Sequence, residues 1–382
     1  MFDSNKSRDC IRAIKGWKDH YDTDDIPALS AELKESESGE YYQEEHPALR
    51  LDYIKASLPS NRSLEEYLKE VEDSAITAVL NDIQEKKELE EVSKELVGND
   101  VILNSYGWIN DTILNEGRFV GIMLRPRFDI GIKAIVNRMG LQFTQPQTGL
   151  KIYLYHSQRR EHLAVYEFTS TKAGDFVWQD VNEFIMTADD KELSGGTYYL
   201  GYYQDDIMGN AVQYRKLNWD TGFCRSCDQG VRQKAYGSIS KHIQMGAFYV
   251  PSANLDAGRL MFDPEAVMTV SENNWGMNLN ISVNCDLTNF ICDNRNILKK
   301  ALGLKVAEKI MKGMLFSTEI NSIEEQLRFA MIRELEGDKE TRHTPLPKRY
   351  EKAIEALHLN TSSINSTCLP CQRKSGVSYG SH

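Results

Sequence analysis

The chain has 382 residues, of which 41% are hydrophobic and 26% charged, and it contains only 10 prolines. This composition excludes an intrinsically disordered protein, and the length predicts two or three domains. The formal net charge of −11 and the lack of a basic block argue against a general or sequence-specific nucleic-acid binder, because duplex affinity comes largely from Lys and Arg that neutralise phosphates.

The negative charge is concentrated in the first quarter of the chain. Residues 1–100 contain 13 Lys and Arg against 25 Asp and Glu, a net of −12, whereas residues 101–382 contain 32 against 31, a net of +1. Residues 22–45 hold nine acids, one lysine and few large aliphatic side chains. Such a segment buries too little apolar surface to offset its ordering entropy, so we predict an acidic, partly extended arm over 1–62. We expect the arm at 22–45 to bind a basic groove on a neighbouring protein.

A helical segment is expected over 63–116. Ser63 followed by Glu66 forms a capping-box pattern that marks a helix start. An apolar stripe then runs from Leu64 to Ile83 and resumes at Leu89, which predicts a helix or helix pair over roughly 63–97. The opposite face is rich in Glu and is interpreted either as a solvated face or as an acidic docking surface.

From about residue 118 the apolar residues alternate instead, and Gly and Pro turn signals separate most of the runs. Eight short aromatic-rich strands with no helical pattern between them predict an antiparallel β-sandwich of jelly-roll type over 117–284. The candidate strands are 118–126, 135–143, 151–157, 162–169, 175–181, 196–203, 212–219 and 242–250.

Helical spacing returns after Cys285. It predicts a long helix over roughly 289–316, a second from about 320 to 331 and a short third around 347–358, within a C-terminal helical segment over 285–360. A polar, cysteine-bearing tail follows over 361–382. The expected fold class is therefore α+β, with a central antiparallel sandwich between helical segments.

Two of the cysteine spacings point to a metal. Cys224 and Cys227, and Cys368 and Cys371, are CxxC pairs, and two such pairs can complete a tetrahedral thiolate site for a structural zinc ion. Local disulfides are the alternative, which the lack of an N-terminal signal peptide disfavours.

The other three cysteines are expected to have minor roles. Cys285 and Cys292 are candidates to replace one CxxC pair in the metal site, although their wider spacing fits buried apolar positions better. Cys10 is interpreted as a lone residue on a short helix.

Other candidate sites have weaker patterns. Asp205 and Asp206 follow a strand and are a candidate calcium site. His156 and His162 flank a hairpin tip, where a polar loop is favoured over a catalytic dyad. A tyrosine-rich strand is a candidate platform for stacking sugars, with alternation placing about half of its rings in the core. Its tyrosines are Tyr198, Tyr199, Tyr202 and Tyr203.

Several strings together resemble a family of structural proteins of tailed bacteriophages and prophages of Bacteroides-type gut bacteria. The strings are GRFVGIML at 117–124, GLQFTQPQ at 140–147, KIYLYHSQ at 151–158, GGTYYLGYYQDD at 195–206, CDLT at 285–288 and CLPC at 368–371. The resemblance covers about residues 110–382 and brings no catalytic residue with it. It implies a virion component of the neck, tail or baseplate, built into a ring or similar symmetric assembly.

No Walker loop, dinucleotide fingerprint, nucleophile elbow or HExxH motif occurs in the sequence, and no apolar run is long enough to span a bilayer. We therefore expect a non-enzymatic structural protein that is assembled in the bacterial cytoplasm and binds copies of itself and other virion proteins. The alternative is a carbohydrate-binding β-sandwich module that recognises a host surface.

Overall fold

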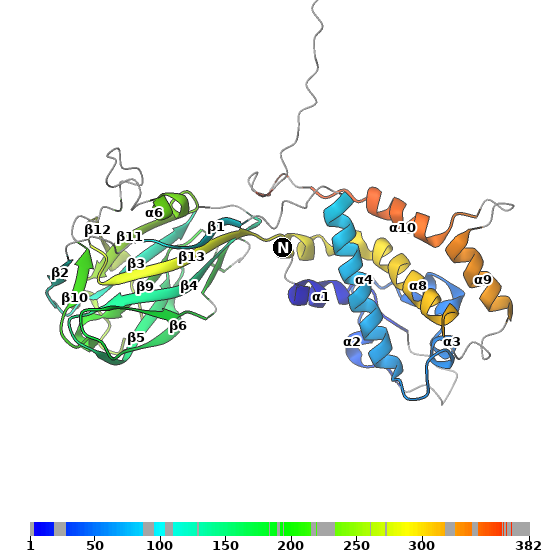
Figure 1. Ribbon diagram of the computed structural model, residues 1–382, viewed down its shortest axis with the longest axis horizontal. Coiled ribbons are helices and arrows are strands. Elements are labelled where there is room, and N and C mark those ends of the chain that lie inside the picture. The colour runs from blue at the N-terminus through cyan, green and yellow to red at the C-terminus, as the bar shows by residue number, and fades with distance from the viewer. Residues whose placement is uncertain are drawn as a thin grey trace, which may run out of the picture. The chain divides into compact units, whose positions relative to one another are not determined.

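The protein has an α+β fold, shown as a computed structural model in Figure 1, and its chain divides into two compact units. The helical unit combines Met1–Val92 with Leu287–His382, and the β unit is Ser93–Asp286. The structure describes residues 4–18, 28–86, 95–103, 110–127, 130–182, 184–188, 192–193, 195–214, 219, 234–259, 261–271, 273–317, 325–337, 343–360, 362, 364 and 368. Segments from opposite ends of the sequence thus build one unit, with the β unit inserted between them.

The helical unit is organised around one helix that is apolar on most sides. This helix, α8 (Lys299–Leu315), buries residues from Ala301 to Met314 and packs against α4 (Leu64–Lys86), α9 (Glu325–Glu336) and α10 (Leu346–Glu355). Burial on most sides explains why its apolar residues do not form a single stripe. Figure 1 shows α4 and α8 side by side.

Helix α4 follows from its sequence pattern. Its apolar residues recur with helical spacing, with Glu65 and Glu66 in its first turn and Lys86 in its last, so the charges complement the helix dipole. The helix ends ahead of the predicted position 97, and the chain is already a strand from Glu95. The second part of the predicted apolar stripe therefore does not extend the helix to 97.

The predicted arm contains folded structure of its own. It includes α1 (Ser4–Arg12), α2 (Ala31–Lys34), α3 (Leu51–Ala56) and the short 3-10 helices η1 (Tyr42–Glu44) and η2 (Pro47–Leu49). Side chains along it, including Ile14, Trp17, Tyr42 and Leu49, are completely buried. The rest of the helical unit adds α7 (Thr288–Asp293) and η7 (Arg295–Leu298).

The β unit contains two large antiparallel sheets and a two-stranded ladder. The five-stranded sheet has the order β1-β13-β4-β7, with β8 also paired to β4, and the six-stranded sheet has the order β12-β11-β3-β9-β5-β6. Aromatic contacts join the sheets, since Phe143, directly after β4, meets Phe168 and Tyr202 of the six-stranded sheet at centroid distances of 6.3 and 5.4 Å. The strand bounds are β1 Glu95–Val101, β2 Asn110–Ile113, β3 Phe119–Pro126, β4 Ile132–Gln142, β5 Gln147–His156, β6 Arg159–Ser170, β7 Phe176–Asp180, β8 Ile185–Thr187, β9 Tyr198–Tyr203, β10 Ala211–Tyr214, β11 Ile243–Val250, β12 Met268–Val270 and β13 Met277–Cys285.

The central strands of the six-stranded sheet, β11, β3 and β9, are buried on both faces. One set of alternating residues, such as Ile152 and Tyr202, belongs to the core that the sheets share. The opposite set forms an aromatic cluster with Phe262, a residue of the connection between β11 and β12. The members of this cluster are Phe119, Tyr155, Tyr199, Tyr203, Phe248, Val250 and Phe262. The connection from β11 to β12 therefore covers a sheet face that strand alternation alone would leave to solvent.

Seven of the eight predicted strands match observed strands closely, as β3 to β7, β9 and β11 with shifts of a few residues. The predicted strand 212–219 corresponds to β10, which ends at Tyr214. Five strands were not predicted: β1, β2, β8, β12 and β13. The most consequential is β13, which pairs with both β1 and β4 in the middle of its sheet.

Candidate functional site

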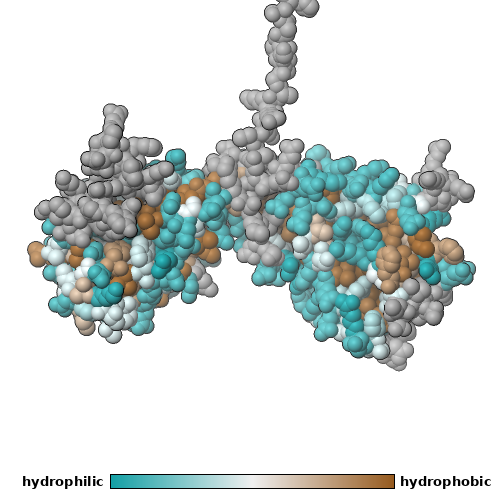
Figure 2. All heavy atoms as spheres, viewed as in Figure 1, coloured by the Kyte–Doolittle hydropathy of each residue, from teal (hydrophilic) through white to brown (hydrophobic). Residues whose placement is uncertain are grey.

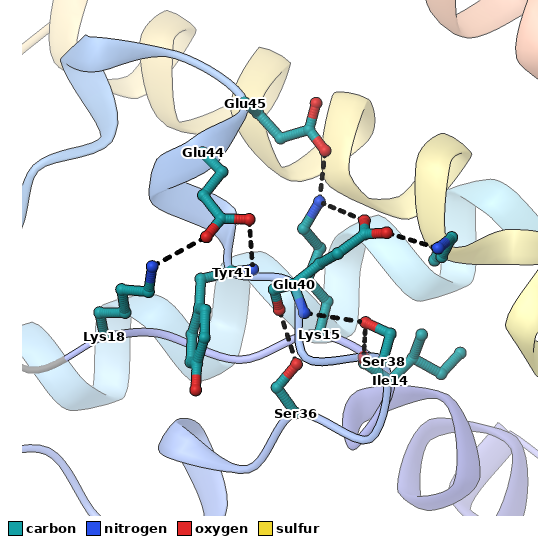
Figure 3. Close-up of polar contacts among 10 residues, drawn as sticks. Ile14, Lys15, Lys18, Ser36, Ser38, Glu40, Tyr41, Glu44 and Glu45 are labelled. Atoms are coloured by element: carbon teal, nitrogen blue, oxygen red, sulfur yellow. Dashed lines mark hydrogen bonds and ion pairs between the residues drawn. The ribbon is translucent and has the colours of Figure 1, made fainter.

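A charged network fastens the N-terminal segment to α8. Lys15, in the turn after α1, is only 2% exposed, and its Nζ donates to Glu45 Oε1 and lies 3.6 Å from Glu40 Oε2. Figure 3 shows this lysine between the two carboxylates. Glu40 also accepts from Nζ of Lys299, the first residue of α8. A buried ammonium is costly unless it is paired, so the two glutamates are required for Lys15 to occupy this position.

Two glycines allow the close contacts around this network. A Cβ at Gly303 of α8 would lie 2.4 Å from Glu45 Oε1 and 2.9 Å from Lys15 Nζ, so the ion pair sits where the helix has no side chain. A Cβ at Gly16 would lie 2.4 Å from the Glu35 carbonyl oxygen. Gly16 also accepts a backbone hydrogen bond of 3.0 Å from the amide of Tyr42.

Serine hydroxyls fix the turn that carries Glu40. Ser36 Oγ donates to the Glu40 carbonyl oxygen at 2.6 Å, and Ser38 Oγ donates to the Ile14 carbonyl oxygen at 2.6 Å (Figure 3). Gly39 has φ of 69°, in the left-handed region that a glycine adopts without a Cβ penalty. The sequence SESGE at 36–40 is therefore a defined turn that holds the Glu40 carboxylate beside Lys15.

Further ion pairs surround the network. Glu37 accepts from Arg295 Nε and Nη2 at 2.7 and 2.9 Å, and Lys18 Nζ donates to Glu44 at 2.8 Å. Hydrogen bonds from Arg295 and Lys18 lower the pKa values of Glu37 and Glu44, respectively. The acids of residues 28–45 are thus used largely inside the helical unit.

These contacts correct the prediction of an extended arm, and they occupy several of the acids that were expected to bind a basic groove on a neighbour. The acids in the described part of this segment, 28–45, pair with basic residues of the same chain. Arg295 and Lys299 follow the β unit in sequence, whereas Lys15 and Lys18 precede the acids. A window of local composition cannot detect partners about 260 residues away. The rest of the predicted arm, 22–27, lies outside the described residues.

A second polar cluster lies where α1, the chain after it and α4 meet. Arg12 forms 2.5 Å ion pairs with Glu32 and Asp73, while its Nε lies 3.8 Å from Glu72 Oε2. Glu72 is 1% exposed, and its Oε1 accepts a 2.5 Å hydrogen bond from Trp17 Nε1. Burial raises the pKa of Glu72 to about 8, against the opposing effects of Trp17 and Arg12. Glu72 is therefore a mostly protonated carboxylic acid at neutral pH.

The predicted zinc ligands fall mostly outside the described part of the chain. Cys224, Cys227 and Cys371 are not among the described residues, and Cys368 is buried with its sulfur in a disulfide. A sulfur in a disulfide cannot serve as a thiolate ligand, so a zinc site would require Cys368 to be reduced. Among the described residues, no group of three or more His, Cys, Asp or Glu side chains is placed to hold a metal ion.

The roles expected of Cys10 and Cys292 are wrong. The two residues form a disulfide between α1 and α7, with their Cα atoms 5.7 Å apart, so Cys10 is not a lone residue and Cys292 is not a buried apolar one. Their separation of 282 residues left no local spacing pattern to reveal the pair. Cys285 is buried at the end of β13, but its sulfur is in a disulfide, so the expectation of a simple buried apolar residue is wrong for it as well.

The tyrosines proposed as a sugar platform are buried in the sheet. Tyr198, Tyr199, Tyr202 and Tyr203 are between 0% and 8% exposed, so the platform hypothesis is wrong for these residues. For Tyr199 and Tyr203 the reason is the cover over the second face of the six-stranded sheet, where both belong to the cluster with Phe262. Phe262 stacks on Tyr155 with ring centroids 4.8 Å apart.

The remaining candidate residues have structural contacts. Asp206 accepts from Arg259 Nη1 at 2.5 and 2.6 Å, and the Arg259 guanidinium lies over the Tyr203 ring at 4.4 Å. This pairing gives Asp206 a cation partner from the protein itself. His156 is buried against Tyr198, and His162 makes edge contacts with tyrosine rings of β5.

Comparisons of the chain with protein-family models, with curated proteins and with solved structures found no match. Among the helices that the structure describes, none is long and apolar enough to cross a membrane.

Proposed function

We propose that this protein is a non-enzymatic structural and assembly protein of a tailed phage particle. In this proposal it is a connector, tail or baseplate component that forms a symmetric oligomer and is assembled in the bacterial cytoplasm. We also propose that the two large sheets of the β unit form a jelly-roll-like sandwich. Its partners are copies of itself and other virion proteins.

The observation that supports an assembly role most directly is the exposure of two phenylalanines in the helical unit. Phe316, directly after α8, is 84% exposed, and Phe329 of α9 is 64% exposed. Helices α8 and α9 pack against each other, and Figure 2 shows apolar residues gathered on this part of the helical unit. Burying one such side chain stabilises a protein or complex by about 1.5–3 kcal/mol, so both phenylalanines favour an assembly in which a partner covers them.

Symmetric assembly would use such a surface repeatedly. In a closed ring every subunit presents the same patch, so two phenylalanines per subunit contribute at every interface. The exposed side chains of the β unit, such as Leu114 at 74% and Met261 at 57%, are candidates for contacts with other virion proteins.

Sedimentation of purified variants tests this role. We expect the wild type to form a discrete oligomer, and the double variant Phe316→Asp and Phe329→Asp to sediment as a monomer with an unchanged circular dichroism spectrum. Leu114→Asp is the matched control for self-association only, because it places the same charge on an exposed apolar position of the β unit that is assigned to other partners. A wild type that is monomeric at every concentration, with a double variant that enters particles as well as wild type, would contradict the proposal.

A structural zinc ion at Cys224, Cys227, Cys368 and Cys371 belongs to the same proposal for the reduced chain. The basis is the two CxxC spacings, which suit a tetrahedral thiolate site. Metal analysis of protein purified under reducing conditions is expected to give one zinc per chain, lost on Cys224→Ser substitution. A folded, reduced sample without zinc would rule the site out.

A further inference from the structure

The disulfide between Cys10 and Cys292 connects two parts of the helical unit that are remote in sequence. Cys10 lies in the last turn of α1, and Cys292 lies near the end of α7, the first helix after the β unit. Both cysteines are half-buried, so a small thiol in solution has access to the bond. Cys292 Sγ also lies 4.0 Å from the Lys6 carbonyl oxygen, which places the bond against the first turn of α1.

The two halves of the segment 4–17 are anchored unequally. Ile11, Ile14 and Trp17 are at most 1% exposed, and Arg12 pairs with acids of α2 and α4. In the preceding turns, Asn5, Lys6 and Asp9 are exposed. Apolar burial and ion pairs therefore hold the second half in place, while the first half has little apolar contact.

Polar atoms further weaken the packing of the first half. Ser7 is completely buried, and within the described part of the chain neither its Oγ nor the Arg8 Nε has a hydrogen-bond partner. A buried polar atom without a partner costs free energy relative to a hydrated one. The noncovalent attachment of residues 4–10 is thus mainly polar, and the covalent bond to α7 adds to it.

We propose that Cys10 and Cys292 are a reversible redox site that fixes the first half of α1 to α7 when oxidised and releases it when reduced. The reactants are thiols of low molecular weight, such as glutathione, or the paired thiols of a reducing protein. Release makes residues 4–10 available to another molecule while the second half of the segment stays docked. This proposal does not depend on a role in a phage particle.

The exchange balances as two thiol–disulfide steps. A thiolate of the reductant attacks one sulfur of the Cys10–Cys292 bond, the S–S bond breaks, and the released cysteine thiolate takes up a proton. A second reductant thiolate then attacks the mixed disulfide, which leaves both cysteines as thiols and the reductant as its own disulfide. The protein gains two electrons and two protons, and the reverse sequence with glutathione disulfide restores the bond.

Hydrogen exchange measured by mass spectrometry on the full chain tests the proposal. The wild type is compared in glutathione disulfide and in glutathione, alongside a Cys10→Ser and Cys292→Ser double variant. We expect amide exchange of residues 4–10 to become roughly tenfold faster or more on reduction, with little change in α4 and α8. The double variant should exchange at the fast rate in both buffers. Labelling with a maleimide should show the two thiols appearing together.

Three results would overturn the proposal. The first is equal exchange of residues 4–10 in the oxidised and reduced wild type. The second is a reductant effect on these residues that persists in the double variant, because it would assign the effect to other cysteines. The third is free Cys10 and Cys292 thiols in the glutathione disulfide buffer.

Discussion

Glu72 gives the helical unit a specific dependence of stability on pH. Its folded-state pKa is raised to about 8, whereas an unperturbed glutamate titrates near 4.5, so between these values the unfolded state has lost a proton that the folded state keeps. The free energy of unfolding therefore falls as pH rises from about 4.5 to about 8, and it is level outside this window. The Glu72→Gln variant removes the titration and keeps an amide oxygen to accept from Trp17.

The magnitude follows from the size of the shift. Each pKa unit corresponds to about 1.4 kcal/mol, so the contribution accumulates to roughly 4–5 kcal/mol across the window. We expect the variant to gain about 1.4 kcal/mol over wild type for each pH unit between pH 5 and pH 8. Glu72 lies on α4 beside Arg12, Trp17 and Asp73, with Glu32 also near, and the substitution leaves these four side chains in place.

Urea unfolding followed by circular dichroism at 222 nm, repeated from pH 5 to pH 9, measures the difference between variant and wild type. The subtraction matters because other carboxyls, such as Glu40 and Glu308, have lowered pKa values and lose their contribution as pH falls. Glu66→Gln, an exposed position on the same helix, is the control. Its difference in unfolding free energy from wild type should not change with pH. If the difference in unfolding free energy between Glu72→Gln and wild type does not change with pH, Glu72 is not a protonated buried acid.

Two further substitutions test the contacts that hold each unit together. Gly303→Ala should lower the unfolding free energy by about 1–3 kcal/mol, because its Cβ displaces the buried Lys15–Glu45 pair, and a double-mutant cycle with Lys15→Met should abolish most of that loss. An additive cycle would contradict this. Phe262→Ala should destabilise the β unit by about 3–5 kcal/mol and speed tryptic cleavage after Arg259, whereas Met261→Ala, at a 57% exposed position, should do neither. Equal cleavage rates would show that Phe262 does not anchor this connection.

Local periodicity predicted the elements that local interactions determine. The alternating strands and the helices α9 and α10 were predicted near their observed positions because their apolar spacing is set within one element. The long helix predicted over 289–316 is divided into α7, η7 and α8, and α4 ends at Lys86, ahead of the predicted 97. The strand β13 had the same signal, since Met277, Leu279, Ile281 and Val283 alternate with polar residues, and a systematic search for period-two patterns would have found it. Its Asn278 and Asn280 are buried as well, with hydrogen bonds to β1 and the chain directly after it.

Features that depend on distant pairs were not accessible in this way. The acids of the N-terminal segment predicted a free arm because Arg295 and Lys299 are remote in sequence. The same distance concealed the Cys10–Cys292 bond. The burial of Tyr199 and Tyr203 depends on Phe262, which no strand pattern connects to them. In each case the sequence shows the chemical group, and the fold supplies its partner.

The most direct test of the proposed function is quantitative mass spectrometry of purified phage particles, with an isotope-labelled copy of this chain as the standard. We predict that the chain is present in a fixed ratio to the portal subunits, in a copy number that matches one or more symmetric rings. Its absence from intact particles that infect normally would contradict the structural role.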